Sequence, residues 1–223
     1  ADYTSTSGTS VVLAQGASVD DLVVIVVYDV FSVADTVSKS SGGSFDSAVT
    51  FNTKLATSNL GTGAILQVQY LQIDTTVASI SVSANTDTVV TQLTVNITPK
   101  STSSIIRLDT HIFHEWANAD APTEAAWFFY RDTTKLAASA ASNRQSGISM
   151  SRISYHASDA GSTPEIATYS YFDQPSSTSQ ITYKVGVRNH YATNFSLNRT
   201  INDTDQSQAE RGMSFISATE IAG

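Results

Sequence analysis

The chain has 223 residues, of which 41% are hydrophobic and only 14% charged, and its abundant Ser, Thr and Val are typical of an all-β protein rather than a helical bundle. A formal net charge of −8, with Lys and Arg scattered singly, opposes binding to a phosphate backbone, so nucleic acid is not expected as a partner. No apolar run approaches the roughly 20 residues of a membrane-spanning helix, so membrane insertion is not expected. The absence of cysteine excludes a disulfide framework and thiolate chemistry.

Residues 1–37 are predicted to form a small β-hairpin module. A short strand is expected at residues 10–13, a turn through residues 15–21, and a stronger strand at residues 22–30. Residues 23–27 are continuously apolar, which indicates burial on both faces of that strand. Because an isolated hairpin is marginal in water, an upstream strand or neighbouring copies of the chain must supply the burial.

The stretch "DYTSTSGTSVVLAQGASVDDLVVIVVYDVFSVAD" resembles the N-terminal module of tailed-bacteriophage tail fibres, especially those of marine and short-tailed phages. The resemblance implies that residues 1–37 attach the fibre to other virion proteins. In that family the hairpin follows an earlier strand ending in an Asn-Gly turn, which this sequence lacks. The sequence also begins at Ala1 with neither an initiator Met nor a signal peptide, so we expect a fragment or a processed product.

Residues 38–62 are predicted to be a Ser/Gly-rich linker that leads into a short shaft. The segment "GGSFDSAVTFNTKLA" resembles fibre shafts in which three chains wrap short strands around one axis, with Phe45, Val49 and Phe51 as the apolar positions. A single chain cannot bury so thin a stripe, which favours a homotrimer. The alternative is a surface linker that carries one isolated hairpin.

Residues 63–223 are predicted to form a C-terminal antiparallel β-sandwich resembling a jelly roll, because short alternating strands are separated by turns. Residues 118–127, which contain Pro122, could form one or two helical turns in a loop. The expected strands are 64–72, 80–83, 92–98, 104–116, 126–131, 148–156, 165–173, 181–188 and 213–221.

Four stretches of this domain, "ITPKSTSSIIRL", "FFYRDTTKLA", "SYFDQPSSTSQITYKV" and "NRTINDTDQSQAERGMSFISATEI", resemble the C-terminal domains of marine-phage tail-fibre and structural proteins. The resemblance implies a virion fibre protein, a homotrimer whose distal head contacts a host-surface glycan or protein. A capsid (head) fibre or decoration protein, and a carbohydrate-binding domain, remain alternatives.

The segment "THIFHEW" at 110–116 brings together residue types that bind zinc, namely His111, His114 and Glu115. The order differs from the helical zincin motif. On a strand, His111 and Glu115 would share one face while His114 and Trp116 point to the other, so one metal could not bind all three easily. We therefore predict no metal site here.

A second acidic cluster, Asn202, Asp203 and Asp205, offers oxygen ligands for calcium but lacks the glycine and terminal Glu of an EF-hand loop. A turn stabilised by Asx hydrogen bonds is the preferred interpretation. Arg199 and Arg211 are close enough in sequence to form structural salt bridges with these carboxylates.

No catalytic residue or cofactor site is predicted, and the protein is not expected to be an enzyme. The sequences "GISMS" at 147–151 and "GMSFI" at 212–216 each lack the second glycine of a nucleophile elbow, and no spacing ties His156 or His190 to a triad. No phosphate-binding glycine loop and no pair of carboxylates suited to a glycosidase is evident.

Aromatic side chains could build a sugar-stacking platform, but most are expected in the core or at subunit interfaces. Sequons occur at four asparagines, which would matter only in a eukaryotic secretory pathway. The aromatic candidates are Trp116, Trp127, Tyr130, Tyr155, Tyr169, Tyr171 and Tyr191, and the sequons are at Asn96, Asn194, Asn198 and Asn202.

Overall fold

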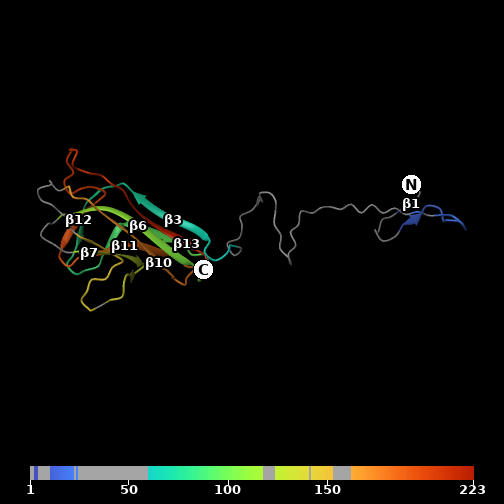
Figure 1. Ribbon diagram of the computed structural model, residues 1–223, viewed down its shortest axis with the longest axis horizontal. Helices are drawn as coiled ribbons and strands as arrows, with labels where there is room; N and C mark the ends of the chain where they lie inside the picture. The colour runs from blue at the N-terminus through green and yellow to red at the C-terminus, as the bar shows by residue number, and fades with distance from the viewer. Residues whose placement is uncertain are drawn as a thin grey trace. The chain divides into compact units, whose positions relative to one another are not determined.

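The computed structural model describes residues 3–4, 11–22, 24, 60–117, 124–140, 142–152 and 162–223. It divides the chain into two compact units, Ala1–Asn52 and Thr53–Gly223 (Figure 1). The described residues form strands and no helix, and hence no helix able to cross a membrane. The prediction of an all-β chain with a C-terminal antiparallel sandwich is confirmed.

The first unit contains a small antiparallel pair, in which β1 (Tyr3–Thr4) lies beside β2 (Val12–Leu13). The predicted turn is present, because the Asp21 amide donates to the Ser18 carbonyl at 3.2 Å and the Ser18 amide donates to the Asp21 carboxylate at 2.6 Å. Strand β2 pairs with β1, a strand at residues 3–4 that the sequence did not predict. The predicted strand at 22–30 lies outside the described residues except for positions 22 and 24, as does nearly all of the linker and shaft at 38–62.

The larger sheet of the second unit is organised around β6 (Ile105–Trp116), its longest strand. One edge of β6 pairs with β10, while its other edge is shared by β13 and, near Trp116, by β12. Outside these, β3 pairs with β13 and β4 pairs with β12, all antiparallel (Figure 1). The bounds are β3 Ile65–Ile73, β4 Val77–Val82, β10 Glu165–Asp173, β12 Thr193–Leu197 and β13 Ser214–Ile221.

The smaller sheet has the order β5, β11, β7, with β8 and β9 both beside the far edge of β7. The β-branched residues that dominate β5 suit a pleated, half-buried surface. The bounds are β5 Thr88–Ile97, β7 Glu124–Arg131, β8 Thr134–Leu136, β9 Ser149–Arg152 and β11 Ile181–Arg188.

The core lies between the two sheets, where every second residue of each strand points inward. Its largest rings form a cluster in which Trp116 and Phe195 lie 4.9 Å apart and Trp127 and Phe195 lie 5.7 Å apart. Eight of the nine strands predicted in this unit coincide with strands of the structure, and the ninth, predicted at 148–156, coincides with β9, except that residues 153–156 lie outside the described residues. The sequence did not predict β8 and β12, and the helical turns considered at 118–127 are wrong where the structure describes them, because Glu124 begins β7.

Candidate functional site

The larger sheet has an outer face of mixed polar and apolar side chains, made by the residues of β10, β6, β13 and β3 that alternate with core residues. Four apolar side chains on it are exposed: Val68 by 50%, Tyr70 by 73%, Ile166 by 58% and Phe172 by 61%. We call this surface the outer face of the larger sheet. Its members are Val68, Tyr70, Gln72, Arg107, Asp109, His111, Phe113, Ile166, Thr168, Ser170, Phe172, Phe215, Ser217 and Thr219.

The charges on this face cancel. The Arg107 guanidinium lies 3.0 Å from the Asp109 carboxylate and 6.0 Å from the centre of the Phe172 ring. The Ser170 hydroxyl also donates to Asp109 at 2.6 Å, and His111 stacks on Phe215 with 6.0 Å between ring centres. Within a chain of net charge −8, this face is formally neutral. Because this face has no net charge, a second copy of the acidic chain is not repelled from it.

The outer face of the smaller sheet exposes fewer large apolar side chains than that of the larger sheet. Its Phe128 is fully buried, and the Lys135 amine lies 3.9 Å above the centre of its ring. Asp87 pairs with both Lys135, at 3.1 Å, and Arg188, at 3.2 Å. Among the described strands of this sheet, the one exposed large apolar side chain is Met150. This face therefore has the polar character of a solvent-facing sheet.

The predicted metal candidates are divided between two faces of β6, as the strand alternation indicated. His114 points into the core, where it contacts Trp116, Trp127 and Phe195 with ring centres 4.9 to 6.0 Å apart. Burial lowers its pKa to about 4, although its Nδ1 donates to the Ile112 carbonyl at 3.2 Å. Its Nε2 is 3.9 Å from a Glu165 oxygen, too far for a hydrogen bond, so at neutral pH the imidazole is an uncharged core group.

Two buried glutamates serve as hydrogen-bond acceptors that join segments far apart in sequence. Glu115 accepts from the Thr163 amide at 2.6 Å and the Ile201 amide at 2.5 Å. Glu220 accepts from the Lys100 amide at 2.5 Å, the Ser104 hydroxyl at 2.6 Å and the Gln67 side chain at 2.5 Å. Both carboxylates therefore have structural partners.

The loop at 199–211 holds the predicted ion pairs. Asp203 lies 3.1 Å from the Arg199 guanidinium and 2.5 Å from that of Arg211, which confirms the structural salt bridges. The Asn202 side-chain oxygen accepts from the Thr204 amide at 3.3 Å, as an Asx turn requires. Within the described ranges, no group of three or more His, Asp or Glu side chains is arranged to hold a metal ion.

A network that the sequence did not reveal joins β7, β10 and β11. Arg131 donates to both oxygens of Asp173, at 2.9 and 3.1 Å, and the Tyr183 hydroxyl donates to the same carboxylate at 2.7 Å. Burial, and then this hydrogen bond, raise the pKa of Tyr183 above its ordinary value. Arg131 and Tyr183 pair between β7 and β11, whereas Asp173 comes from the larger sheet. Only the packing of the two sheets brings the three residues together, so no sequence motif could have indicated them.

The serine and histidine candidates have other partners. Ser149, the serine of "GISMS", lies in β9 opposite Trp127, and Ser214, the serine of "GMSFI", donates to the Asn198 side chain at 2.6 Å. His190 lies 3.2 Å from the Asn85 side-chain oxygen, and His156 is outside the described residues.

Three of the six described aromatic candidates are buried core residues. Trp116, Trp127 and Tyr169 are buried, and the Tyr169 hydroxyl donates to the Phe128 carbonyl at 3.0 Å. Tyr130 and Tyr171 are half-buried, Tyr191 is exposed, and Tyr155 is outside the described residues. The exposed rings of the outer face, on Tyr70 and Phe172, were not singled out from the sequence.

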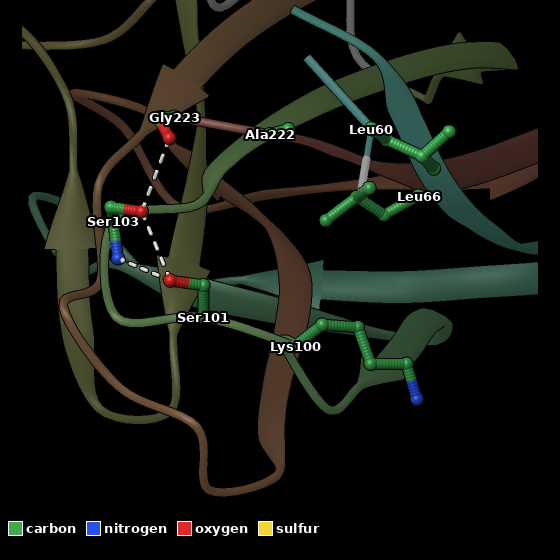
Figure 2. Close-up of a pocket in the computed structure, with 7 residues that line it drawn as sticks. All are labelled: Leu60, Leu66, Lys100, Ser101, Ser103, Ala222 and Gly223. Carbon is green, nitrogen blue, oxygen red and sulfur yellow. Dashed lines mark hydrogen bonds between the residues drawn. The ribbon is translucent and has the colours of Figure 1, made fainter. Parts of the chain in front are cut away.

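A hollow of about 330 Å³ lies where the start of β3 meets the end of the chain (Figure 2). Figure 2 shows Ser101, Ser103 and Gly223 linked to one another, with 2.9 Å between the two hydroxyls, while the Lys100 amine points away from them. Because these polar groups bond to each other, they do not converge on a ligand. The lining residues are Leu60, Leu66, Lys100, Ser101, Ser103, Ala222 and Gly223.

Comparisons with known proteins do not assign this chain to a family. No family model matches the sequence, and no curated protein matches it. Among solved structures, the chain is similar to one titled "Structure of a marine algae virus of the order Picornavirales", with 12% identity over 94% of this chain and 92% of that chain and a TM-score of 0.17. A TM-score of this size supports no inference about the fold or function of this chain.

Proposed function

We propose that this protein is a non-enzymatic structural component of a virion, a homotrimeric fibre protein whose N-terminal part attaches to other virion proteins. The observation that carries the proposal is the outer face of the larger sheet, which exposes Ile166 and Phe172 although the sandwich already has a complete core. Exposed apolar side chains that recur along β3 and β10 of the same face are where we expect other proteins to bind.

Other copies of the chain are the partner that fits this face best. Two acidic copies repel one another, so contact is favoured where each presents least charge. The Arg107–Asp109 pair leaves this face neutral, whereas Lys135, Arg188 and Asp87 occupy the opposite sheet. Three-fold assembly would also bury the thin apolar stripe predicted in the shaft at 38–62.

The buried titratable groups support a structural rather than a catalytic role. Glu115, Glu220 and Asp173 each accept several hydrogen bonds from the fold, and His114 is enclosed by aromatic rings. A general acid or base needs access to a substrate, which these groups lack. The virion setting and the host-surface contact of the head are drawn from the resemblance to phage fibre proteins.

The test is the solution mass of the purified chain by light scattering, together with resistance to dissociation in detergent. We expect a complex built on three chains. Replacing Ile166 and Phe172 with Lys should weaken it, while Lys at Thr91 and Asn96, exposed positions on β5 of the smaller sheet, should not. A stable monomer would contradict the proposal.

A further inference from the structure

Strand β3 is an edge strand without the usual protection of an edge. Its nine residues, "ILQVQYLQI", include no charge, proline or glycine. One side of β3 pairs with β13, and within the part of the chain that the structure describes no strand pairs with its other side (Figure 1). A row of unpaired amides and carbonyls on an uncharged strand is a template for pairing with another chain.

The other edges of the sandwich are interrupted, short or charged. The pairing of β5 with β11 shifts register between Lys184 and Val185 of β11. The pairing of β4 with β12 shifts register between Phe195 and Leu197 of β12. Strand β8 has three residues and includes Lys135, and β9 has four. The register shift of β3 lies at its start, between the contacts with Glu220 and Ile221, so Gln67–Ile73 pair regularly with β13.

The sequence of β3 is close to self-complementary when two copies run antiparallel about Gln69. Val68 of one copy then lies opposite Tyr70 of the other, and both side chains belong to the outer face. A β-branched residue opposite an aromatic one is a favourable cross-strand pair. The same self-pairing of β10 would instead place the two acids Glu165 and Asp173 opposite each other.

We propose that β3 pairs antiparallel with β3 of a second copy, centred on Gln69, and joins the two larger sheets into one continuous sheet. This contact is isologous, with a two-fold axis through the centre of the strand pair. It goes beyond the proposed fibre, because a two-fold contact joins copies that belong to different trimers. The complete assembly then contains six chains.

A single-cysteine variant tests the register directly, because the natural chain has no cysteine. In Gln69→Cys the two thiols face each other across the axis, where directly opposed Cα atoms are about 4.5–5.5 Å apart, within disulfide range. In the matched control Gln72→Cys, on the same strand, the two thiols are separated by about 20 Å along the paired strands. After mild oxidation we expect about ten-fold more cross-linked dimer for Gln69→Cys than for the control.

Failure of this pairing is distinguishable from failure of the trimer. If Gln69→Cys stays uncross-linked, or if Gln72→Cys cross-links equally, the β3 pairing is wrong whatever the mass of the complex. If Gln69→Cys cross-links but the natural chain has a mass of two copies, the pairing stands and the trimer does not. Gln69→Lys, on the side of the strand away from the outer face, places two like charges opposite each other on the axis and should convert a six-chain complex into a three-chain one. An unchanged mass would also overturn the pairing.

Discussion

The outer faces of the two sheets differ in whether their large apolar side chains are buried or exposed. On the smaller sheet, Phe128 is fully buried between Gly186 and Lys135, within a single copy of the chain. On the larger sheet, Phe172 is 61% exposed and Tyr70 is 73% exposed, with no comparable cover. Contacts within one copy bury the large ring on the smaller sheet, whereas the larger sheet is the surface that we propose other copies cover.

The largest expected difference comes from truncating one phenylalanine on each face. Phe128→Ala removes a buried ring and should lower the free energy of unfolding by about 3–5 kcal/mol. Phe172→Ala removes an exposed ring and should change it by no more than about 0.5 kcal/mol. Urea unfolding at low chain concentration measures both, and equal losses would remove the contrast between the faces.

Strand β6 has one histidine on each face, His114 in the core and His111 on the outer face. Burial lowers the pKa of His114 to about 4 in the folded chain, below its ordinary 6.5, so between these values the unfolded chain binds more protons. Stability should therefore fall as the pH drops from 6.5 to 4, by about 3 kcal/mol.

Thermal unfolding across this pH range measures the loss. His114→Phe should flatten the profile, while His111→Gln, on the outer face, should preserve it. If both variants keep the natural profile, another group is responsible.

A smaller effect is expected at the glycine beneath Phe128. A Cβ at position 186 would lie 2.3 Å from the Phe128 ring, so Gly186→Ala must displace the ring and should cost about 1–3 kcal/mol. Gly61→Ala is the control, because no atom lies within 4 Å of the added group. Denaturant midpoints of the two variants report the difference, and equal midpoints would mean that Phe128 does not rest on this glycine.

The smallest effect on stability, but a large one on assembly, is expected from charge on the larger sheet. Ile166→Lys with Phe172→Lys should change the free energy of unfolding of the dissociated chain by about 0.5 kcal/mol or less. The same pair should reduce the mass of the complex, since buried unpaired charges are costly at an interface. Sedimentation at several chain concentrations checks this, and an unchanged mass would exclude the outer face as the contact.

Much of the fold could be predicted because hydrophobic alternation is local. The strand expected at 165–173 coincides with β10, and that expected at 181–188 coincides with β11. Strand β8, of three residues, and β12, "TNFSL", carry little alternation of their own and depend on their partners. Pro122 suggested a helical turn within residues 118–127, but residues 124–127 pair with β9 and β11 as a strand.

The candidate site was only partly predictable. The two faces of "THIFHEW" follow from the period of a strand, and the ion pairs of Asp203 follow from short spacing in sequence. The outer face of the larger sheet does not follow in this way. Its four exposed apolar side chains come from β3 and β10, which pair with different strands, so only the sheet order shows that they lie on the same face.

Hydroxyl-radical footprinting of the assembled chain tests most directly whether other copies cover the larger sheet. The side chains to follow are Ile166 and Phe172, with the exposed Met150 of the smaller sheet as the internal reference. We expect Ile166 and Phe172 to be protected in the complex and to become reactive when it is dissociated, while Met150 reacts in both states. Equal reactivity of all three side chains in the complex would contradict the account.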